Sequence, residues 1–346
     1  MPVTTWNDIQ GQDHAVGWLR RAWKADRLPH GLIFAGPGGV GKGMVANALA
    51  TLFLCECPDG ELPCAVCPAC RALAAASHPD LHLIYRQLVR LEHEDRKASE
   101  LSINLIRDCL IEPASRKAGL NRGKVFIVEE AELMNAAAQN ALLKVLEEPA
   151  GRTLIILLTD QPDALLPTVR SRCQIVRFVP LPAELVQSQL TRRGISPADA
   201  ADAAALSGGS PGLAIAWLQD GVVTGARELR ERLERLISGK PVDDLPEWFR
   251  AATDALVTLR MERDKLASKE QTTRGAVLTY LTIAGRFLSQ RMAASEDSAL
   301  LERLCKAAEA IGRAAALVES NVNVSLIFQE LAVTLEELAA SAAGQR

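Results

Sequence analysis

The chain has 346 residues, which is enough for two or three domains at roughly 150 residues each. Hydrophobic residues make up 48% and charged residues 23%, the composition of a globular protein, and the net charge is −3. This charge argues against a protein that holds nucleic acid over a broad face by itself. No apolar run approaches the ~20 residues of a membrane span, and the first eight residues do not form a basic start followed by an apolar stretch. We therefore expect a soluble, cytoplasmic chain with no membrane association.

The first half of the chain alternates strand and helix patterns. The predicted helices are Asp13–Asp26, Met44–Leu54, Ile103–Lys117 with a break near Pro113, and Asn135–Leu146. The predicted buried strands are Gly31–Ala35, Leu81–Tyr85, Lys124–Val128, Leu154–Thr159 and Ile175–Phe178. A charged stretch, Arg86–Glu100, is expected to form a mobile loop. Strands that alternate with helices favour a parallel sheet covered on both faces.

After Pro180–Pro182 only helical periodicity remains. The clearest predicted helices are Glu184–Arg193, Pro197–Leu206, Gly212–Gln219, Arg227–Ile237, Leu266–Arg291, Ala299–Glu319 and Leu326–Ala340. The fold class is therefore α/β plus all-α. We divide the chain into an α/β domain at 1–180, a small helical domain at 181–222 and a C-terminal helical bundle at 223–346.

Five of the eight cysteines lie between Cys55 and Cys70. With no export signal, thiolate metal ligation is a better explanation than a disulfide framework. Cys64, Cys67 and Cys70 supply three sulfurs on a tight turn, and four thiolates suit a structural Zn²⁺. We prefer Cys55 to Cys57 as the fourth ligand, because Cys55 ends a helical run. Reduced loop thiols and an iron–sulfur cluster are the alternatives.

A glycine-rich segment follows the first predicted strand and precedes a helix. Residues 36–42 read Gly-Pro-Gly-Gly-Val-Gly-Lys, the spacing of a P-loop. Its glycines, which let backbone N–H groups surround a phosphate, are Gly36, Gly38, Gly39 and Gly41. Lys42 can reach the outer phosphates, but Gly43 stands where a hydrolysing NTPase has the Ser or Thr that ligates Mg²⁺. Binding of ATP or ADP is therefore expected to be weak or absent; the alternative is a tight turn with no function.

Two acidic residues follow the strand Lys124–Val128. Glu129 stands where an Asp normally orients the metal shell of a P-loop enzyme, and its extra methylene would displace the carboxylate. The alternative is that Glu129 and Glu130 only cap the following helix. Either way the sequence keeps the scaffold of a nucleotide site and alters its catalytic groups.

Several segments together resemble the clamp-loader group of AAA+ proteins, which serve bacterial DNA polymerase III. They are Leu28–Gly36, the four cysteines, His78-Pro79-Asp80, Gln139–Pro149, Leu166–Cys173 and Gly209-Ser210-Pro211-Gly212. The resemblance covers roughly residues 3 to 215. It implies an AAA+ core with an inserted zinc module at 55–70, a helical lid and a collar domain. His78 itself is expected to be a turn residue and not a ligand.

The resemblance also implies roles for individual residues. Arg172, in Ser171-Arg172-Cys173, would reach into a neighbouring subunit's ATP site, where a guanidinium supplied in trans stabilises phosphoryl transfer. Thr159 would contact the γ-phosphate, whereas Gly212 stands where hydrolysing relatives carry a lid arginine. The alternative for Arg170 and Arg172 is pairing with local carboxylates.

We therefore expect a non-hydrolytic, stator-like clamp-loader subunit with no intrinsic activity, which shares in nucleotidyl transfer only as part of the polymerase holoenzyme. Its expected partners are the gamma/tau and delta subunits and, through the complex, the sliding clamp and primer-template DNA. One alternative is an ATP-hydrolysing gamma/tau-type motor, which Gly43, Glu129 and Gly212 argue against. Another is a zinc-dependent nucleic-acid binder, although Arg71 is the only basic residue near the cysteines.

Overall fold

A computed structural model describes residues 4–88, 100–120, 122–240, 242, 244–265, 267–320, 324, 326–331 and 333–334. The chain divides into two compact units, Met1–Ala214 and Ile215–Arg346. Helix α11 (Pro211–Gln219) contains the point of division. The predicted division into three domains remains a prediction.

The first unit is built on a parallel sheet of five strands in the order β2-β3-β4-β1-β5. The strands are β1 (Gly31–Ala35), β2 (Leu81–Ile84), β3 (Lys124–Val128), β4 (Thr153–Thr159) and β5 (Gln174–Arg177). All five strands predicted from the sequence are confirmed within one residue at each end. β1, β3 and β4 are buried along their whole length, because helices cover both faces of the sheet.

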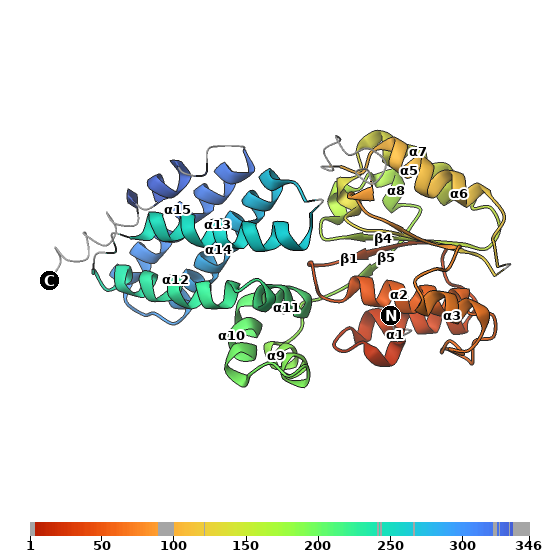
Figure 1. Cartoon of the computed structure of the whole chain (residues 1–346), viewed down its shortest axis with the longest axis horizontal. Coiled ribbons are helices and arrows are strands. Elements are labelled where there is room, and N and C mark those ends of the chain that lie inside the picture. The colour runs from red at the N-terminus through yellow and green to blue at the C-terminus, as the bar shows by residue number, and fades with distance from the viewer. Residues whose placement is uncertain are drawn as a thin grey trace. The chain divides into compact units, whose positions relative to one another are not determined.

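Helices lie on both sides of this sheet (Figure 1). On one face lie α1 (Asp13–Lys24), α2 (Lys42–Leu54) and α3 (Pro68–Ala74). On the other lie α5 (Ile103–Ile106), α6 (Glu112–Ser115), α7 (Ala136–Glu147) and α8 (Pro167–Arg170). After β5, α9 (Ala183–Arg192) and α10 (Pro197–Ser207) precede α11. The predicted α/β architecture is thus present in the first unit.

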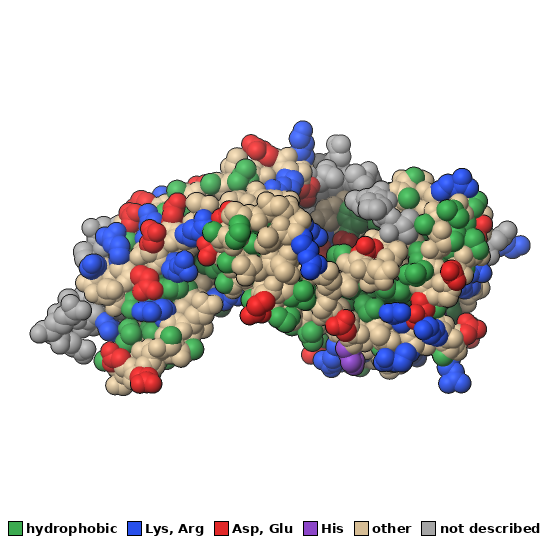
Figure 2. All heavy atoms as spheres, turned by 90° about the horizontal axis from the view of Figure 1, so that it is seen from below, with side chains coloured by type: hydrophobic (Ala, Val, Ile, Leu, Met, Phe, Trp, Pro, Cys, Tyr) green, Lys and Arg blue, Asp and Glu red, His purple; other side chains and the backbone are tan. Residues whose placement is uncertain are grey.

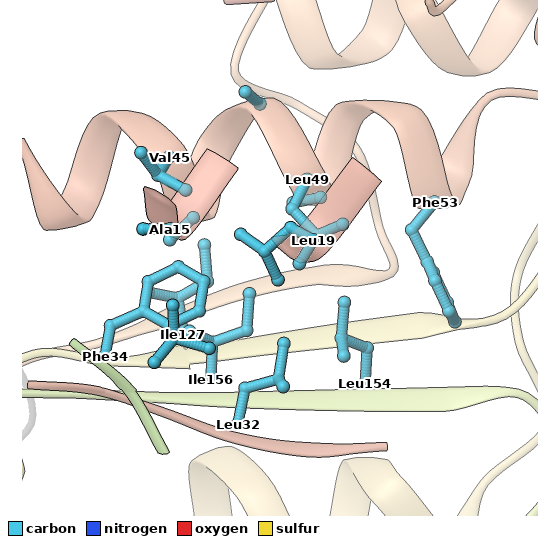
Figure 3. Packing of buried hydrophobic residues seen from close by; sticks show 14 of the residues in the cluster. Ala15, Leu19, Leu32, Phe34, Val45, Leu49, Phe53, Ile127, Leu154 and Ile156 are labelled. Carbon is cyan, nitrogen blue, oxygen red and sulfur yellow. The ribbon is translucent and has the colours of Figure 1, made fainter. Parts of the chain in front are cut away.

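The core under α1 and α2 fixes the strand that leads into the glycine-rich loop. Leu19 of α1 and Leu49 of α2 point toward Leu32, Phe34 and Ile156 on the sheet (Figure 3). These five side chains are fully buried. Burial of each large apolar side chain contributes about 1.5–3 kcal/mol, so the start of α2 is held firmly against β1.

Two parts of the first unit differ from the sequence prediction. The break expected near Pro113 is a wider π-helical turn at Arg107–Ile111, which lies between α5 and α6. Pro113 has no N–H to donate, and the widened turn ahead of it lets the chain continue as a helix. Helix α3 was not predicted, although Pro68 is its first residue and the Cys67 sulfur accepts from the Cys70 N–H at 3.4 Å. Most of the predicted loop Arg86–Glu100 lies outside the described residues.

The second unit is helical in its described residues. Its helices after α11 are α12 (Val222–Ile237), α13 (Leu245–Arg263), α14 (Lys269–Ala293) and α15 (Ser298–Glu319). The prediction of helices throughout this region is confirmed where residues are described; the last predicted helix, Leu326–Ala340, is described only in part. Its core includes an aromatic group in which Trp248 contacts Phe249 and Tyr280, with ring centroids 5.4 Å apart in each pair.

Basic, acidic and hydrophobic side chains lie side by side on the face seen in Figure 2, which agrees with the small net charge of the chain. Among the described helices, none combines the length and the apolar character that a membrane crossing requires.

Asp80 joins the segment before β2 to the loop before β3. Its side chain is 4% exposed, and its carboxylate accepts from the backbone N–H groups of Gly119 (2.7 Å) and Leu120 (2.9 Å). His78 stands in the turn before it, where the Leu81 N–H donates to its carbonyl at 3.3 Å. The His-Pro-Asp motif therefore has a structural role, and His78 lies in a turn as expected.

We predict that Asp80→Ala lowers the free energy of unfolding by about 2–4 kcal/mol, because two hydrogen bonds to a buried charge are lost together. Urea denaturation followed by circular dichroism measures this change. Asp108→Ala is the matched control, since Asp108 is exposed and should change stability by less than about 0.5 kcal/mol. Equal stabilities for the two variants would contradict the role given to Asp80.

Candidate functional site

The glycine-rich loop lies at the carboxyl end of β1 and runs directly into α2. Gly36, Gly39 and Gly41 have φ values of 157°, 72° and 107°, which L side chains rarely adopt. A Cβ at Gly36 would stand 2.4 Å from the Phe178 carbonyl oxygen. The backbone of this loop therefore requires glycine, as the P-loop spacing predicts.

Lys42 is folded back onto its own loop. Its side chain is 9% exposed, and its ammonium donates to the carbonyl of Gly36 and to that of Pro37, the latter at 2.8 Å. Burial lowers the pKa of Lys42, and the negative charges of Asp160 and Glu132 partly offset that effect. The amine that would bind a nucleotide's outer phosphates is thus already occupied by backbone oxygens.

The start of α11 lies against the same loop. The Ser210 hydroxyl donates to the Gly38 carbonyl at 2.8 Å, and the Gly212 N–H donates to the Gly39 carbonyl at 2.9 Å. A Cβ at Gly212 would stand 3.0 Å from both the Cα and the carbonyl oxygen of Gly39. An arginine at position 212 would therefore push α11 and the loop apart, so the glycine at this position permits their close approach.

Glu129 follows β3, at the same carboxyl edge of the parallel sheet as the glycine-rich loop, and β4 lies between β3 and β1. Burial raises the pKa of Glu129. Thr159, at the end of β4, lies next to β1: its carbonyl accepts from the Gly36 N–H at 3.1 Å, and its hydroxyl accepts from the Gln161 N–H at 3.0 Å.

Sequence reasoning missed Asp160, Glu132 and Gln12. Asp160 directly follows a predicted strand, a position that places a carboxylate at the loop edge of a parallel sheet and could have been noticed. Glu132 lies in the turn after β3, and its pKa is raised chiefly by burial. Gln12 is 3% exposed and donates to the carbonyls of Val40 (3.2 Å) and Val179 (2.7 Å), so it ties the loop to the segment after β5. No sequence pattern indicates that contact.

Arg172 lies at the opposite edge of the sheet. A Cβ on Gly31, the first residue of β1, would stand 3.2 Å from the Arg172 carbonyl oxygen, which places Arg172 beside the amino end of that strand. Its guanidinium donates to Glu147 at 2.7 Å and to the Thr168 carbonyl at 3.0 Å. The side chain is 34% exposed, and that of Glu147 is 48% exposed. Arg172 therefore forms the local ion pair that was the alternative interpretation of its sequence motif. Its side chain remains accessible to solvent and to a second molecule.

Four cysteine sulfurs form a compact cluster at the end of α2. The Sγ atoms of Cys55, Cys64, Cys67 and Cys70 all lie within 4.8 Å of one another, which suits a four-thiolate metal site. Backbone N–H groups of Val66 and Cys67 lower the pKa of Cys64 to about 6, so this thiol ionises readily. Cys57 is exposed and lies outside the cluster of four, although its Sγ is 3.3 Å from that of Cys64.

Taken together, a parallel sheet with a glycine-rich loop and a lysine between strand β1 and helix α2 defines a P-loop α/β protein. The family described as DNA polymerase III, delta subunit, matches residues 11–182. The delta' subunit of DNA polymerase III from Pseudomonas aeruginosa is 33% identical over 267 residues, which are 72% of this chain and 77% of that protein. The chain therefore belongs to the delta' subunit family of bacterial DNA polymerase III.

Two further similarities cover less of the chain or have a lower sequence identity. The delta' subunit from Bacillus subtilis is 34% identical over 195 residues, 56% of this chain and 55% of that protein, so the match spans about half of that relative. A solved structure of a DNA polymerase III gamma subunit-related protein from Thermotoga maritima covers 93% of this chain and 99% of its own, at 18% identity and a TM-score of 0.41.

We predict that Gly212→Ala lowers the free energy of unfolding by about 1–3 kcal/mol, because the new methyl group overpacks the contact with Gly39. Gly43→Ala is the matched control within α2. A Cβ there meets only Leu158 Cδ1 at 4.0 Å, so we expect a gain of up to about 1 kcal/mol from helix propensity. Thermal unfolding of the two variants measures both changes, and destabilisation by Gly43→Ala alone would contradict this description of the loop.

We predict that the purified chain holds one metal ion and that Cys55→Ser releases it, whereas Cys57→Ser retains it. Loss of one of four thiolates opens the shell, while Cys57 lies outside the cluster. Elemental analysis by mass spectrometry after dialysis measures the metal content per chain. If Cys55→Ser retained the metal ion and Cys57→Ser lost it, Cys57 and not Cys55 would be the fourth ligand.

Proposed function

We propose that this chain is a non-hydrolytic, stator-like subunit of the clamp loader of DNA polymerase III, and that it completes the ATP site of a neighbouring subunit with Arg172. The observation that carries the proposal is the position of Arg172. It lies beside the amino end of β1, whereas the chain's own P-loop follows the carboxyl end of the same strand. A guanidinium at that edge cannot serve its own loop, and it remains partly exposed for another.

The state of the chain's own site supports the same proposal. Gly43 offers no hydroxyl for Mg²⁺, Lys42 donates to the loop's own carbonyls, and Gly212 supplies no lid arginine. Gly43 weakens Mg²⁺ binding, the hydrogen bonds of Lys42 weaken phosphate binding, and Gly212 weakens neutralisation of the phosphate charge. Glycines of the loop and Thr159 retain the form of a nucleotide site, in which ATP or ADP would bind weakly or not at all.

Arg172 would act by exchanging one anionic partner for another. In the isolated chain Glu147 neutralises it in a partly exposed ion pair, and such pairs contribute only about 0–1 kcal/mol. A γ-phosphate presented by a neighbour carries more charge than one carboxylate, and it accepts two parallel hydrogen bonds from a guanidinium. The ion pair with Glu147 therefore orients the Arg172 guanidinium. Breaking this pair costs little free energy when Arg172 moves to the γ-phosphate.

The remaining assignments belong to the same proposal. The partners are the gamma/tau and delta subunits, and the complex acts in the cytoplasm to place the sliding clamp on primer-template DNA. The first unit is an AAA+ core with its lid, and the helices of the second unit form the collar. The cysteine cluster holds a structural Zn²⁺, whose filled thiolate shell leaves no position for a substrate. Nucleotidyl transfer is a property of the holoenzyme and not of this chain.

We predict that Arg172→Ala in a reconstituted loader lowers ATP hydrolysis at the site it faces by about 10³-fold, and that clamp loading falls with it. The matched control is Arg170→Ala. Arg170 pairs with Asp163 at 2.5 Å in the same segment, so its removal tests general damage to that segment. The effect is measured as phosphate release stimulated by DNA and the clamp. Single-turnover kinetics separates the rate at the ATP site that Arg172 faces from the rates at the other sites.

Two results would count against the proposal. One is a loader with Arg172→Ala that hydrolyses ATP at the native rate. The other is vigorous ATP turnover by the isolated chain, which would instead favour a gamma/tau-type motor.

A further inference from the structure

An open cavity of about 1150 Å³ lies at the sheet edge opposite the P-loop. His30, Lys124 and Thr153 line it, and these residues stand at the amino ends of β1, β3 and β4. Arg172 and the cysteine cluster do not line it. The functions proposed above therefore leave this cavity without a role.

The cavity is strongly basic in a chain of net negative charge. Its basic side chains are Arg116, Lys117, Arg122, Lys124 and Arg152. Among the described residues that line it, Asp26 is the only acid. Like charges gathered in a concave surface reinforce one another and attract anions.

Three of these cations are held by neutral carbonyl groups and not by carboxylates. Arg152 donates at 3.0 Å to the carbonyls of Phe53 and Arg122, and its guanidinium lies 4.0 Å from the Phe53 ring centroid. Arg122 Nε donates to the Cys55 carbonyl at 3.0 Å. Lys124 donates to three carbonyls, among them that of Pro113 at 3.3 Å. Such bonds fix the positions of the cations without neutralising their charge.

The electrostatics of Arg152 agree with this geometry. Burial lowers its pKa, and the nearby positive charge of Arg122 lowers it further, while Asp26 offsets only part of the effect. Gly123 allows the close packing beneath it, because a Cβ there would stand 2.4 Å from the Arg152 carbonyl oxygen. The floor of the cavity is therefore a positive surface that Asp26 compensates only in part.

Arg116 and Lys117 are exposed and stand among the lining residues. The Arg116 guanidinium contacts the exposed Glu112 at a long 3.4 Å, a pair of small energy. Both side chains can thus turn toward an incoming anion at little cost.

We propose that this cavity binds a phosphate-rich anion, either the backbone of a nucleic-acid strand or a free polyphosphate. Several fixed cations within one cavity match closely spaced phosphate charges, and arginine forks bind phosphate oxygens in pairs. The volume of about 1150 Å³ is slightly above the roughly 300–1,000 Å³ typical of small-ligand pockets, so it accommodates more than one phosphate group.

The test uses the full chain and a fluorescein-labelled strand of ten deoxythymidines, with binding followed by anisotropy between 50 and 200 mM salt. Inorganic tripolyphosphate is titrated by calorimetry, and tripolyphosphate and a peptide of ten glutamates are each added as competitors of the bound strand. Arg116→Ala/Lys117→Ala is compared with Arg192→Ala/Arg193→Ala, which removes the same charge from exposed positions in and just after α9. Thermal unfolding confirms that both variants are folded, and Lys117→Ala alone replaces the first variant if it is not.

We expect the cavity variant to bind about tenfold more weakly than the native chain, with a salt slope smaller in magnitude by about 1.4 for two lost contacts to a single strand. The control variant should change binding by less than about twofold. Binding of the strand with no effect of tripolyphosphate assigns the site to nucleic acid; tripolyphosphate binding with the same sensitivity to the variant assigns it to free polyphosphate. The proposal is overturned if neither probe binds, if both variants behave alike, or if the glutamate peptide displaces the strand as well as tripolyphosphate does.

Discussion

Strand β1 is hydrogen-bonded to β4 on one side and to β5 on the other, and each end of this buried strand carries a different part of the proposed function. At its carboxyl end, the Gly36 N–H donates to Thr159 and the chain turns into the glycine-rich loop. At its amino end, Gly31 packs against Arg172 and Cys173. Five residues of strand span about 17 Å, so the two edges are separate sites on one rigid support. This separation is the physical reason for proposing that Arg172 acts in trans.

In the proposed function, hydrogen bonds within the chain's own glycine-rich loop weaken its nucleotide site, in addition to the missing groups. A Cβ at Gly43 would meet only Leu158, at 4.0 Å, so packing against the rest of the fold does not require glycine there. Ser210, Gly212 and Lys42, however, already satisfy carbonyl groups of the loop. In the proposed function, a phosphate would compete with these carbonyls for the Lys42 ammonium, and the contacts of Ser210 and Gly212 would hold the start of α11 against the loop.

Cys55 joins the cysteine cluster to the basic cavity. Its sulfur belongs to the group of four, while its carbonyl accepts from Arg122 at the cavity wall. Phe53, two residues earlier and near the end of α2, supplies both a carbonyl and a ring to Arg152. Because α2 begins at the glycine-rich loop, one helix positions the loop, the cysteine cluster and the cavity wall. The cluster therefore stabilises more than its own short segment.

The sequence by itself determined the parallel α/β architecture, the five strands, the P-loop and its missing hydroxyl, and the preference for Cys55 over Cys57 that matches the compact cluster of four sulfurs. These follow from local patterns: hydrophobic periodicity, glycine spacing and cysteine spacing are encoded within a few residues. Only the tertiary structure decided that Asp160 and Glu132 act electrostatically on Lys42, that Glu147 pairs with Arg172, and that Arg152 joins four basic residues of the stretch 116–124 in lining one cavity. Such contacts depend on strand order and on side chains far apart in the chain, which no local pattern specifies.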